Sequence, residues 1–379
     1  MLNSKDTKEK YIREFNNTKI VINEPIENIR FNLNFVYNPF FEILGNSNDI
    51  FTVEFYDNGV LIHTAELTCN MWTKLNRNYF TEWNIIVKKN NEIIYNEMLN
   101  LKNKRVYVSF ESSSLGDSIA WVPYLEEFRK KHDCELVVST FWNKLYEKSY
   151  PDIEFVEPAT VVNNLYAMYY LGWFYDSNKE PVLPNTIPLQ QTATNLLGLD
   201  FVEIKPNMDF IPKEKSITGK YVTIANESTA GLKYWNYPNG WQEVVDYLVH
   251  RGYKVINVSK NGDDLNKVTK LKDTSIENTM NVIHHSEFFI GLSSGLSWLA
   301  WALNKEIIMI SNFTEAEHEF SCHRPINKTV CHGCWNKAEY KFDRGDYNWC
   351  PVNKNTEKQF ECQMGITPSM IITEIKKII

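Results

Sequence analysis

The sequence predicts an α/β protein built from two Rossmann-like domains, with a β-rich domain before them and a cysteine-rich segment after them. Two observations predict this fold. From residue 105 onward, short β-branched runs alternate with amphipathic helical patterns, which is typical of parallel sheets. Residues 17–104 instead contain short alternating apolar and polar runs separated by hairpin signals. A chain of 379 residues is long enough for two or three domains.

The composition is that of a globular protein without a nucleic-acid partner. Hydrophobic residues make up 43% and charged residues 23% of the chain. The formal net charge of -7 argues against nucleic acid as a main partner. No apolar run is long enough to span a bilayer, and the charged start of the chain lacks the apolar region of a secretory signal. We therefore expect a cytoplasmic protein without a membrane span.

The first part of the chain is expected to form an antiparallel β domain of its own. Residues 1–16 are polar and charged and are predicted to be a flexible tail. Residues 17–104 form the predicted N-terminal β domain, beginning with a strand in KIVINEP. The sequences DNG at 57–59 and KNNE at 89–92 predict two hairpin turns within it.

The α/β part divides into two series at a polar, proline-punctuated linker, residues 205–219. The first series, assigned to a domain spanning 105–213, has a strand, a helix over 119–132 and a second strand. The second series, assigned to a domain spanning 214–320, repeats the alternation with helical patterns ending in GLSWLAWALN. A cysteine segment, 321–365, and a C-terminal helix, 366–379, complete the chain. Several kinds of two-domain α/β enzyme share this arrangement.

Asp117 lies where the first α/β series turns from a strand into a helix, in SSSLGDSIAW. Ligands of open α/β sheets bind at such strand ends. A carboxylate there is a candidate general base, because it can take a proton from an attacking hydroxyl group. The alternative is that Asp117 only caps the helix N-terminus, which is a common role for aspartate.

Two loops of the second series are candidates for binding a diphosphate. NESTAGLKYW, at 226–235, offers Ser228, Thr229 and Lys233, and lysine suits phosphate as a compact charge. The alternative for Lys233 is a solvated loop lysine. GLSSGLSWLAWAL, at 291–303, would present backbone N–H groups at a helix N-terminus, which is an anion site, although a tight turn without a ligand is equally consistent.

In the second loop, the candidate residues for binding the diphosphate are Ser293, Ser294 and Gly295. We also expect Gly116 and Ser259 to contact the bound ligand. The loop lacks the GxxxxGK[ST] pattern of ATPases and the GxGxxG pattern of dinucleotide enzymes.

Four cysteines have the spacing of a metal site. Cys331 and Cys334 form a C-x2-C pair, and Cys350 and Cys362 follow in a polar segment with little core of its own. The spacing predicts a structural metal, with zinc as the first expectation. Cys322 and His332 are alternative ligands, and a redox CxxC is the competing interpretation, although it would not need the later cysteines. His284 and His285 are assigned no role.

These motifs together resemble one known family. STAGLKYWNYPNGWQEVVDYL, GLSSGLSWLAWAL, ISNFTEAEHEF and the run from VCHGCWN through QFECQMGITP are similar to bacterial autotransporter heptosyltransferases. These are GT-B enzymes related to the lipopolysaccharide heptosyltransferases. The likeness covers the chain from about residue 105 to its end.

The resemblance implies a protein O-glycosyltransferase that transfers heptose from ADP-heptose to serine hydroxyl groups of an autotransporter-like acceptor. It places the acceptor on the 105–213 domain and the nucleotide sugar on the 214–320 domain. Asp117 then falls on the position of the family's base, Lys233 on its donor lysine, and Ser294, Gly295 and Leu296 on the loop that holds the diphosphate. Glu315 is placed near the donor. The resemblance also favours iron over zinc on the four cysteines and a ring-shaped homo-oligomer, a dodecamer.

We expect a direct displacement with inversion that needs no divalent ion, because no DxD motif is convincingly placed. Lipopolysaccharide heptosyltransferases carry Asp-Thr-Gly where this chain has Ser293-Ser294-Gly295. Two alternatives stay open. One is a GT-B enzyme that uses another nucleotide sugar on a glycan or small molecule. The other is a non-catalytic, metal-stabilised assembly protein.

Overall fold

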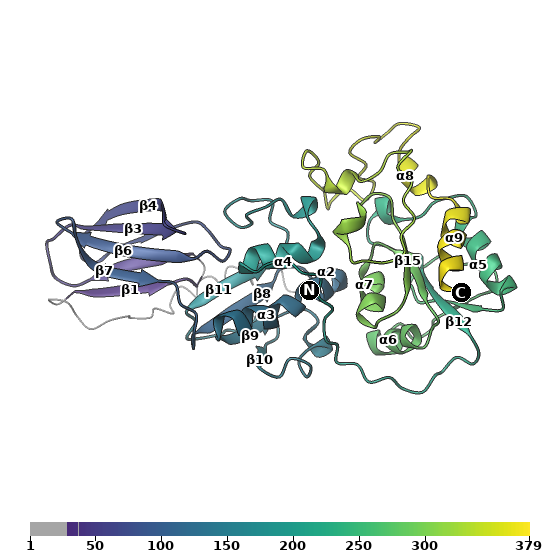
Figure 1. The fold of residues 1–379 in the computed structure, drawn as a ribbon, viewed down its shortest axis with the longest axis horizontal. Helices are drawn as coiled ribbons and strands as arrows, with labels where there is room; N and C mark the ends of the chain where they lie inside the picture. Colours follow the sequence, from purple (N-terminus) through teal and green to yellow (C-terminus); the bar gives the residue numbers. More distant parts are fainter. Residues whose placement is uncertain (1–28, 37) are drawn as a thin grey trace. The chain divides into compact units, whose positions relative to one another are not determined.

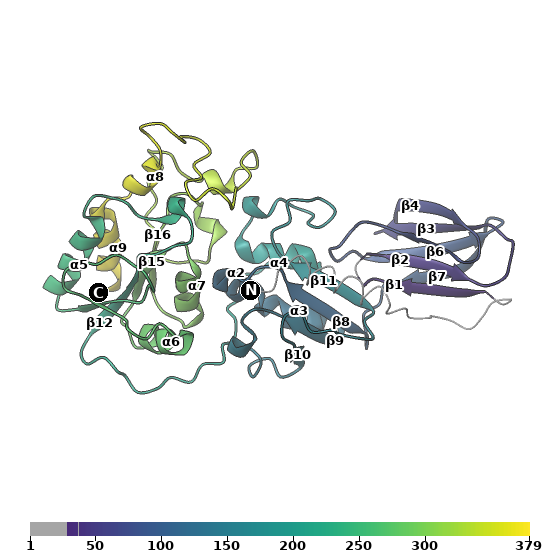
Figure 2. The same ribbon diagram turned by 180° about the vertical axis from the view of Figure 1, so that it is seen from behind.

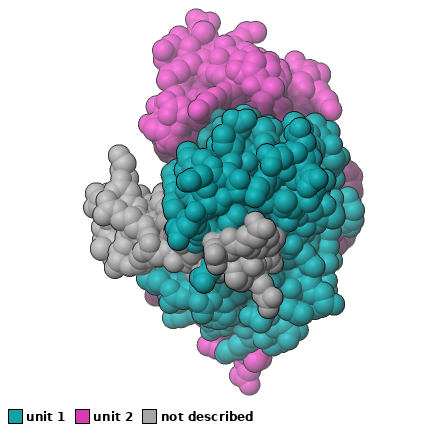
Figure 3. All heavy atoms as spheres, turned by 90° about the vertical axis from the view of Figure 1, so that its left-hand side faces the viewer, with its two compact units in different colours: residues 1–113, 124–182, 192–202 teal, residues 114–123, 183–191, 203–379 magenta. Residues whose placement is uncertain are grey.

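The computed structural model describes residues 29–36 and 38–379, which form two compact units. Of the described residues, unit 1 comprises 29–36, 38–113, 124–182 and 192–202 (Figure 3). Unit 2 consists of Ser114–Pro123, Leu183–Gln191 and Glu203–Ile379. The predicted tail, 1–16, and the strand predicted in KIVINEP lie outside the described residues.

Two antiparallel sheets form the N-terminal part of unit 1 (Figures 1 and 2). The first has the order β1-β2-β5, with bounds Arg30–Asn34, Phe40–Leu44 and Met71–Lys74. The second has the order β4-β3-β6-β7, with bounds Val60–Leu67, Phe51–Asp57, Trp83–Lys89 and Glu92–Met98. Phe31 and Phe41 of the first sheet contact Tyr95 of the second, with ring centroids 5.1 and 5.9 Å apart. The predicted β-rich architecture is therefore confirmed.

Both predicted hairpin turns are present. Asn58 and Gly59 join β3 to β4 with φ of 47° and 79°, and Asn90 and Asn91 join β6 to β7 with φ of 50° and 66°. Two successive positive φ angles match the type I′ turn, whose twist suits antiparallel strands. Asparagine and glycine tolerate this conformation better than other residues, so these turns could be predicted from local sequence.

A parallel sheet completes unit 1, in the order β10-β9-β8-β11. Its strands are Ile153–Phe155, Glu135–Ser139, Arg105–Phe110 and Ala167–Leu171. The helices of this part of the chain are α3 (Pro123–His132), η1 (Asn143–Leu145), η2 (Pro184–Thr186) and α4 (Leu189–Leu197). η2 belongs to unit 2, and α4 is divided between the two units after Gln191. Strands β8 and β9 agree with the predicted strands, whereas the sequence analysis did not single out β10 and β11.

The helix predicted over 119–132 is two helices in the structure. α2 spans Leu115–Trp121, and α3 begins at Pro123. Proline has no backbone N–H and its ring crowds the preceding turn, which interrupts the helical hydrogen-bond ladder at this point. α2 also begins four residues earlier than predicted, so Asp117 lies in its first turn. α2 belongs to unit 2, although it follows β8 of unit 1 in the chain.

The sheet of unit 2 is parallel throughout, in the order β14-β13-β12-β15-β16. Its strands are Val268–Lys270, Lys254–Asn257, Tyr221–Ala225, Phe289–Leu292 and Ile307–Ile310. The strand order reverses at β12, whose neighbours are β13 and β15. In such a sheet the loops that follow β12 and β15 flank the crevice where ligands bind.

Helices cover the faces of this sheet: α5 (Gly240–His250), α6 (Ile276–His284), α7 (Gly295–Ala302) and α9 (Pro368–Ile378). Ile371 and Ile375 of α9 are fully buried in the same hydrophobic core as Val222 and Ile224 of β12. The C-terminal helix is therefore part of this core. Between β16 and α9 the chain is mostly irregular, with short helices η4 (Ala316–His318), η5 (Cys334–Asn336) and α8 (Glu361–Met364). Within residues 29–36 and 38–379, no helix is long and apolar enough to cross a membrane.

Candidate active site and cysteine pocket

The first turns of α2 and α7 meet at two glycines. A Cβ atom on Gly116 would lie 3.1 Å from Cδ1 of Trp298, and one on Gly295 would lie 3.2 Å from the Gly116 backbone nitrogen. These distances leave room for little more than a hydrogen atom, so the two backbones pack directly together. The contact lies within unit 2 and brings Asp117 beside the N-terminus of α7.

The serines of the α7 loop have different roles. Ser293 Oγ donates a hydrogen bond to Glu319 Oε1 at 2.5 Å, so its proton is already engaged by a protein group. Ser294 is the N-cap residue of α7, but its side chain makes no capping hydrogen bond. Its buried Oγ has no hydrogen-bond partner among the described residues. A buried hydroxyl without a hydrogen-bond partner is unfavourable, so the Ser294 hydroxyl is suited to form a hydrogen bond with a ligand here. Leu296, in the same first turn, is half-buried.

Lys233 ends a short 3-10 turn, η3 (Gly231–Lys233), in the loop after β12. Its Nζ lies 5.9 Å from the centroid of the Phe313 ring, within the range of a cation–π contact. Burial lowers the pKa of Lys233, while the carboxylates of Asp117 and Glu319 oppose that shift. The structure thus brings the predicted base and the predicted donor lysine within electrostatic reach of each other.

Ser293 is hydrogen-bonded to a buried ion pair, Glu319 with Arg324, which was not predicted from the sequence. Arg324 donates to Glu319, and their side chains are only 4% and 1% exposed. Thr314 Oγ1 also donates to Glu319, at 3.1 Å. Although burial alone would raise the pKa of Glu319, the Arg324 guanidinium holds it below its usual value. An acidic and a basic residue five positions apart outside a helix give no recognisable sequence signal.

Ser259 lies two residues after β13 and connects the loops that follow β12 and β13. Its Oγ accepts a hydrogen bond from the Asn226 backbone nitrogen at 3.0 Å. Asn226 Oδ1 accepts from Asn257 at 2.9 Å, and its buried Nδ2 has no partner in the part of the chain that the structure describes. Asn226 was not predicted as a site residue. Ser228 is half-buried and Thr229 is exposed in the loop that follows.

Glu315, predicted to approach the donor, lies against the Cys331–Cys334 turn. A Cβ atom on Gly333 would lie 2.0 Å from Glu315 Oε1, and His332 Nε2 lies 3.9 Å from the same oxygen. The Glu315 backbone nitrogen donates to Asn336 Oδ1 at 2.8 Å. Gly333 has a φ of 61°, so glycine serves both the left-handed turn and the close carboxylate.

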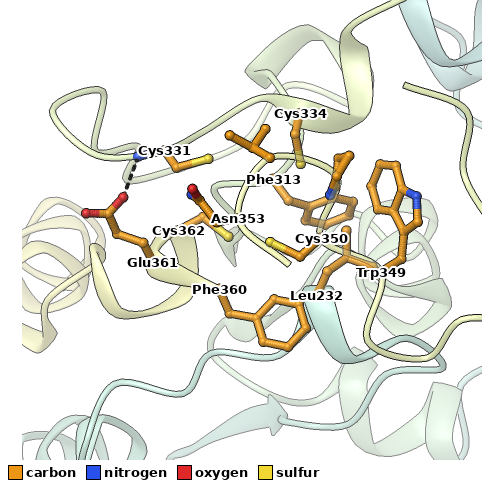
Figure 4. A pocket seen from close by; sticks show the side chains of 12 residues that line it. Leu232, Phe313, Cys331, Cys334, Trp349, Cys350, Asn353, Phe360, Glu361 and Cys362 are labelled. Atoms are coloured by element: carbon orange, nitrogen blue, oxygen red, sulfur yellow. Dashed lines mark hydrogen bonds between the residues drawn. The ribbon is translucent and has the colours of Figure 1, made fainter. Parts of the chain in front are cut away.

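The four predicted cysteine ligands line one small pocket. In Figure 4 the sulfur atoms of Cys331, Cys334, Cys350 and Cys362 point towards a common space. Apolar side chains, including Leu232, Phe313 and Trp349, form much of the remaining wall. Cys322 and His332, the alternative ligands, are not among the residues that line this pocket.

The predicted metal finger is not seen as a formed metal group. As the side chains stand, no group of three or more His, Cys, Asp or Glu residues in the described ranges is gathered closely enough to hold a metal ion. Burial raises the pKa of the Cys334 thiol, and the other three cysteines raise it further. Burial and neighbouring cysteines also raise the pKa of Cys331 and Cys362, and a bound cation would offset this by stabilising the thiolates. The four thiols are therefore the kind of donor that a structural metal ion takes, and their present positions do not form a coordination shell.

Comparisons with known proteins agree with these features. The sequence pattern of glycosyltransferase family 9 (heptosyltransferase) matches residues 187–348. The autotransporter heptosyltransferase Aah of Escherichia coli is 35% identical over 325 residues, covering 81% of this chain and 83% of Aah. An inactive autotransporter heptosyltransferase, BimC of Burkholderia thailandensis, is 30% identical over 80% of this chain and 75% of BimC.

Solved structures support the same assignment. The iron-containing dodecameric glycosyltransferase TibC of enterotoxigenic Escherichia coli superposes with a TM-score of 0.84 at 30% identity, covering 94% of this chain and 97% of TibC. Escherichia coli ADP-heptose lipopolysaccharide heptosyltransferase II shares the fold, with a TM-score of 0.50 at 10% identity over 72% of this chain and 98% of that chain.

The α/β fold and these matches define a glycosyltransferase with a GT-B-like architecture. More narrowly, the chain belongs to the autotransporter heptosyltransferase family.

Proposed function

We propose that this chain transfers heptose from ADP-heptose to serine hydroxyl groups of an autotransporter-like protein in the cytoplasm. The heptosyltransferases Aah and TibC support the sugar and the acceptor class, and TibC has been crystallised with ADP-D-beta-D-heptose. Within this chain, the supporting observation is that Asp117 lies beside the N-terminus of α7 and within electrostatic reach of Lys233.

The diphosphate of the donor would bind between the loops that follow β12 and β15. Lys233 offers a partly desolvated positive charge, and the first turn of α7 offers backbone N–H groups and the unpartnered Ser294 hydroxyl. These groups stabilise the negative charge that develops on ADP as it leaves. Because they supply positive charge themselves, we expect no divalent ion in the transfer step.

Asp117 would act as general base. The bond between the anomeric carbon and the diphosphate oxygen breaks, and its electron pair leaves with ADP. The serine Oγ forms the new bond from the opposite face, so the configuration inverts. The serine proton passes to the Asp117 carboxylate. The α2–α7 contact supports this assignment, because it fixes the carboxylate close to the leaving-group site.

Cys331, Cys334, Cys350 and Cys362 would hold a structural metal ion. Iron is favoured because TibC is iron-containing, and zinc is the alternative that the spacing allows. The bound metal would supply folding energy to residues 321–365, which are mostly irregular. TibC is dodecameric, and we propose a high-order homo-oligomer for this chain as well.

Intact-mass analysis tests the proposed activity. The protein is incubated with a serine-containing autotransporter fragment and a panel of nucleotide sugars. A mass gain of one or more heptoses with ADP-heptose alone is the expected result. A gain with another donor would instead establish the alternative GT-B enzyme. No gain with any donor would favour the non-catalytic assembly protein, an outcome that the inactive relative BimC makes worth testing.

A further inference from the structure

The turn that carries Lys233 is held by the cysteine segment. The Gly231 backbone nitrogen donates to the Tyr347 carbonyl oxygen at 2.9 Å, and the Gly231 carbonyl accepts from Gln363 Nε2 at 2.5 Å. Tyr347 precedes Cys350 by three residues, and Gln363 directly follows Cys362. A Cβ atom on residue 231 would lie 2.7 Å from the Tyr347 oxygen, so the approach of the two backbones requires glycine.

Gln363 bridges the chain on both sides of Lys233. Its side chain is almost fully buried, at 4% exposure. Its Oε1 accepts from Asn236 Nδ2 at 2.5 Å, while its Nε2 donates to Gly231. One amide therefore fastens the segment at positions 231 and 236. The side-chain amide can do this because its oxygen accepts while its NH2 group donates.

Apolar contacts reinforce the same connection. Leu232 and Phe313 line the four-cysteine pocket, and both also line a second pocket that includes Lys233 and Gln363. The two pockets therefore share a wall. The Phe313 ring lies below the Lys233 ammonium group, so a displacement of this wall would also displace the lysine.

We propose that Gln363 is a positioning residue for donor binding. It holds the segment 231–236 so that Lys233 stays directed at the diphosphate, and it thereby couples the folded cysteine segment to donor affinity. The inference rests on the proposed function through the role of Lys233. A preorganised lysine loses less conformational freedom on binding an anion than a lysine on a mobile turn.

The test uses the metal-loaded full chain and ADP as the probe. Gln363→Leu removes both hydrogen bonds. We expect it to weaken ADP binding about tenfold in calorimetry, because two lost buried hydrogen bonds together contribute about that much binding free energy. Gln359→Leu, the same substitution four residues earlier on a partly exposed side chain, is the matched control and should leave the affinity unchanged. Metal content is measured for each protein and should be equal.

A second variant of the same shape distinguishes the loss of one hydrogen bond from misfolding of the segment. Gln363→Glu keeps the side-chain shape and the acceptor for Asn236, but in its ionised form, tested well above the pKa of a glutamate, it cannot donate to the Gly231 carbonyl. It too should weaken ADP binding and speed hydrogen exchange in residues 229–237. If the folded variants bind ADP as tightly as the natural protein, the inference is wrong.

A double-mutant cycle shows whether Gln363 acts through Lys233. Lys233→Met should weaken ADP binding by itself, and adding Gln363→Leu should weaken it little further. Fully additive losses would overturn the positioning role. If Lys233→Met alone has no effect, the proposed donor site itself fails. If it weakens binding while Gln363→Leu does not, only the inference about Gln363 fails.

Discussion

Asp117 and Lys233 carry opposite charges, and the Asp117 carboxylate favours the charged form of Lys233. Burial lowers the pKa of Lys233, and Asp117 is the first of two carboxylates that oppose the shift. A bound diphosphate would add more negative charge and favour the charged lysine further. In the proposed mechanism Asp117 would have two opposed effects: it would supply the base for transfer, and its charge would repel the donor phosphate.

Asp117→Asn separates these two effects. The amide keeps the shape of the side chain but cannot take the serine proton, so transfer should fall about 10²- to 10⁴-fold. ADP binding should be retained or slightly tightened, because a negative charge near the phosphate is removed. Steady-state transfer rates and ADP calorimetry check the two parts. Glu127→Gln, on the half-exposed face of α3, is the control, and an unchanged transfer rate in Asp117→Asn would contradict the role as base.

Glu180 in unit 1 predicts a pH dependence of stability. Its side chain is 3% exposed, its Oε2 accepts from the Phe174 backbone nitrogen at 3.1 Å, and its buried Oε1 has no partner among the residues described. Burial raises the pKa of Glu180 to about 8. Because the folded state holds this proton more tightly than the unfolded state, its stabilising contribution is complete below about pH 4.5 and is lost as the pH rises through 8.

The comparison variant is Glu180→Gln, which stays neutral. Relative to this variant, the natural protein should lose stability with a slope of at most about 1.4 kcal/mol per pH unit between the two pKa values. Urea unfolding at several pH values measures the difference. Parallel pH profiles for the two proteins would show that Glu180 does not titrate in this window.

At the scale of elements, the site depends on the close crossing of α2 and α7. Strand β15 delivers the N-terminus of α7 to the edge of the sheet, and the paired glycines let α2 approach it. Strand β12 delivers the Lys233 turn to the same edge, because parallel neighbouring strands end on the same side.

Gly295→Ala should therefore harm donor binding as well as stability. The new Cβ atom would lie 3.1 Å from the Leu115 Cβ and 3.2 Å from the Gly116 nitrogen, which forces the two helices apart. Overpacking of this kind costs about 1–3 kcal/mol. Thermal unfolding and ADP calorimetry measure both effects. Gly345→Ala, whose nearest neighbour is one flexible Asp343 oxygen, is the control and should be nearly neutral.

At the scale of the whole molecule, unit 2 combines a sheet core of buried apolar side chains with a cysteine segment that has little core of its own. The core includes fully buried residues of β12, α5 and α9. The cysteine segment instead contributes buried thiols and a few aromatic rings around one pocket. The two parts should therefore differ in their dependence on the metal.

Metal removal should loosen residues 331–362 and the Lys233 turn while the sheet core stays protected. Hydrogen exchange followed by mass spectrometry, on chelated and untreated protein, measures this pattern. Cys334→Ser should lose metal by elemental analysis and show the same local loosening. Full metal occupancy in Cys334→Ser would show that the ligand set is wrong, and equal loosening of β12 would show that the core also depends on the metal.

Much of this fold could be predicted because its signals are local. Alternating strands and helices, the Asn-Gly and Asn-Asn turns and the spacing of Cys331 and Cys334 each depend on residues close together in the chain. The break before Pro123 was equally local, but it was overlooked because the apolar pattern continues across it. β10 was missed because it is only three residues long.

The sequence by itself determined the kinds of element, their order, the cysteine spacing and the motifs that resemble the family. The tertiary structure alone decided which segments meet: Gly116 with Gly295, Ser293 with Glu319, and Gly231 with Gln363 across 132 residues. The physical reason is that periodicity and turn preference act over a few residues, whereas these contacts depend on how whole elements pack. A single sequence carries no local signal for a hydrogen bond between such distant residues.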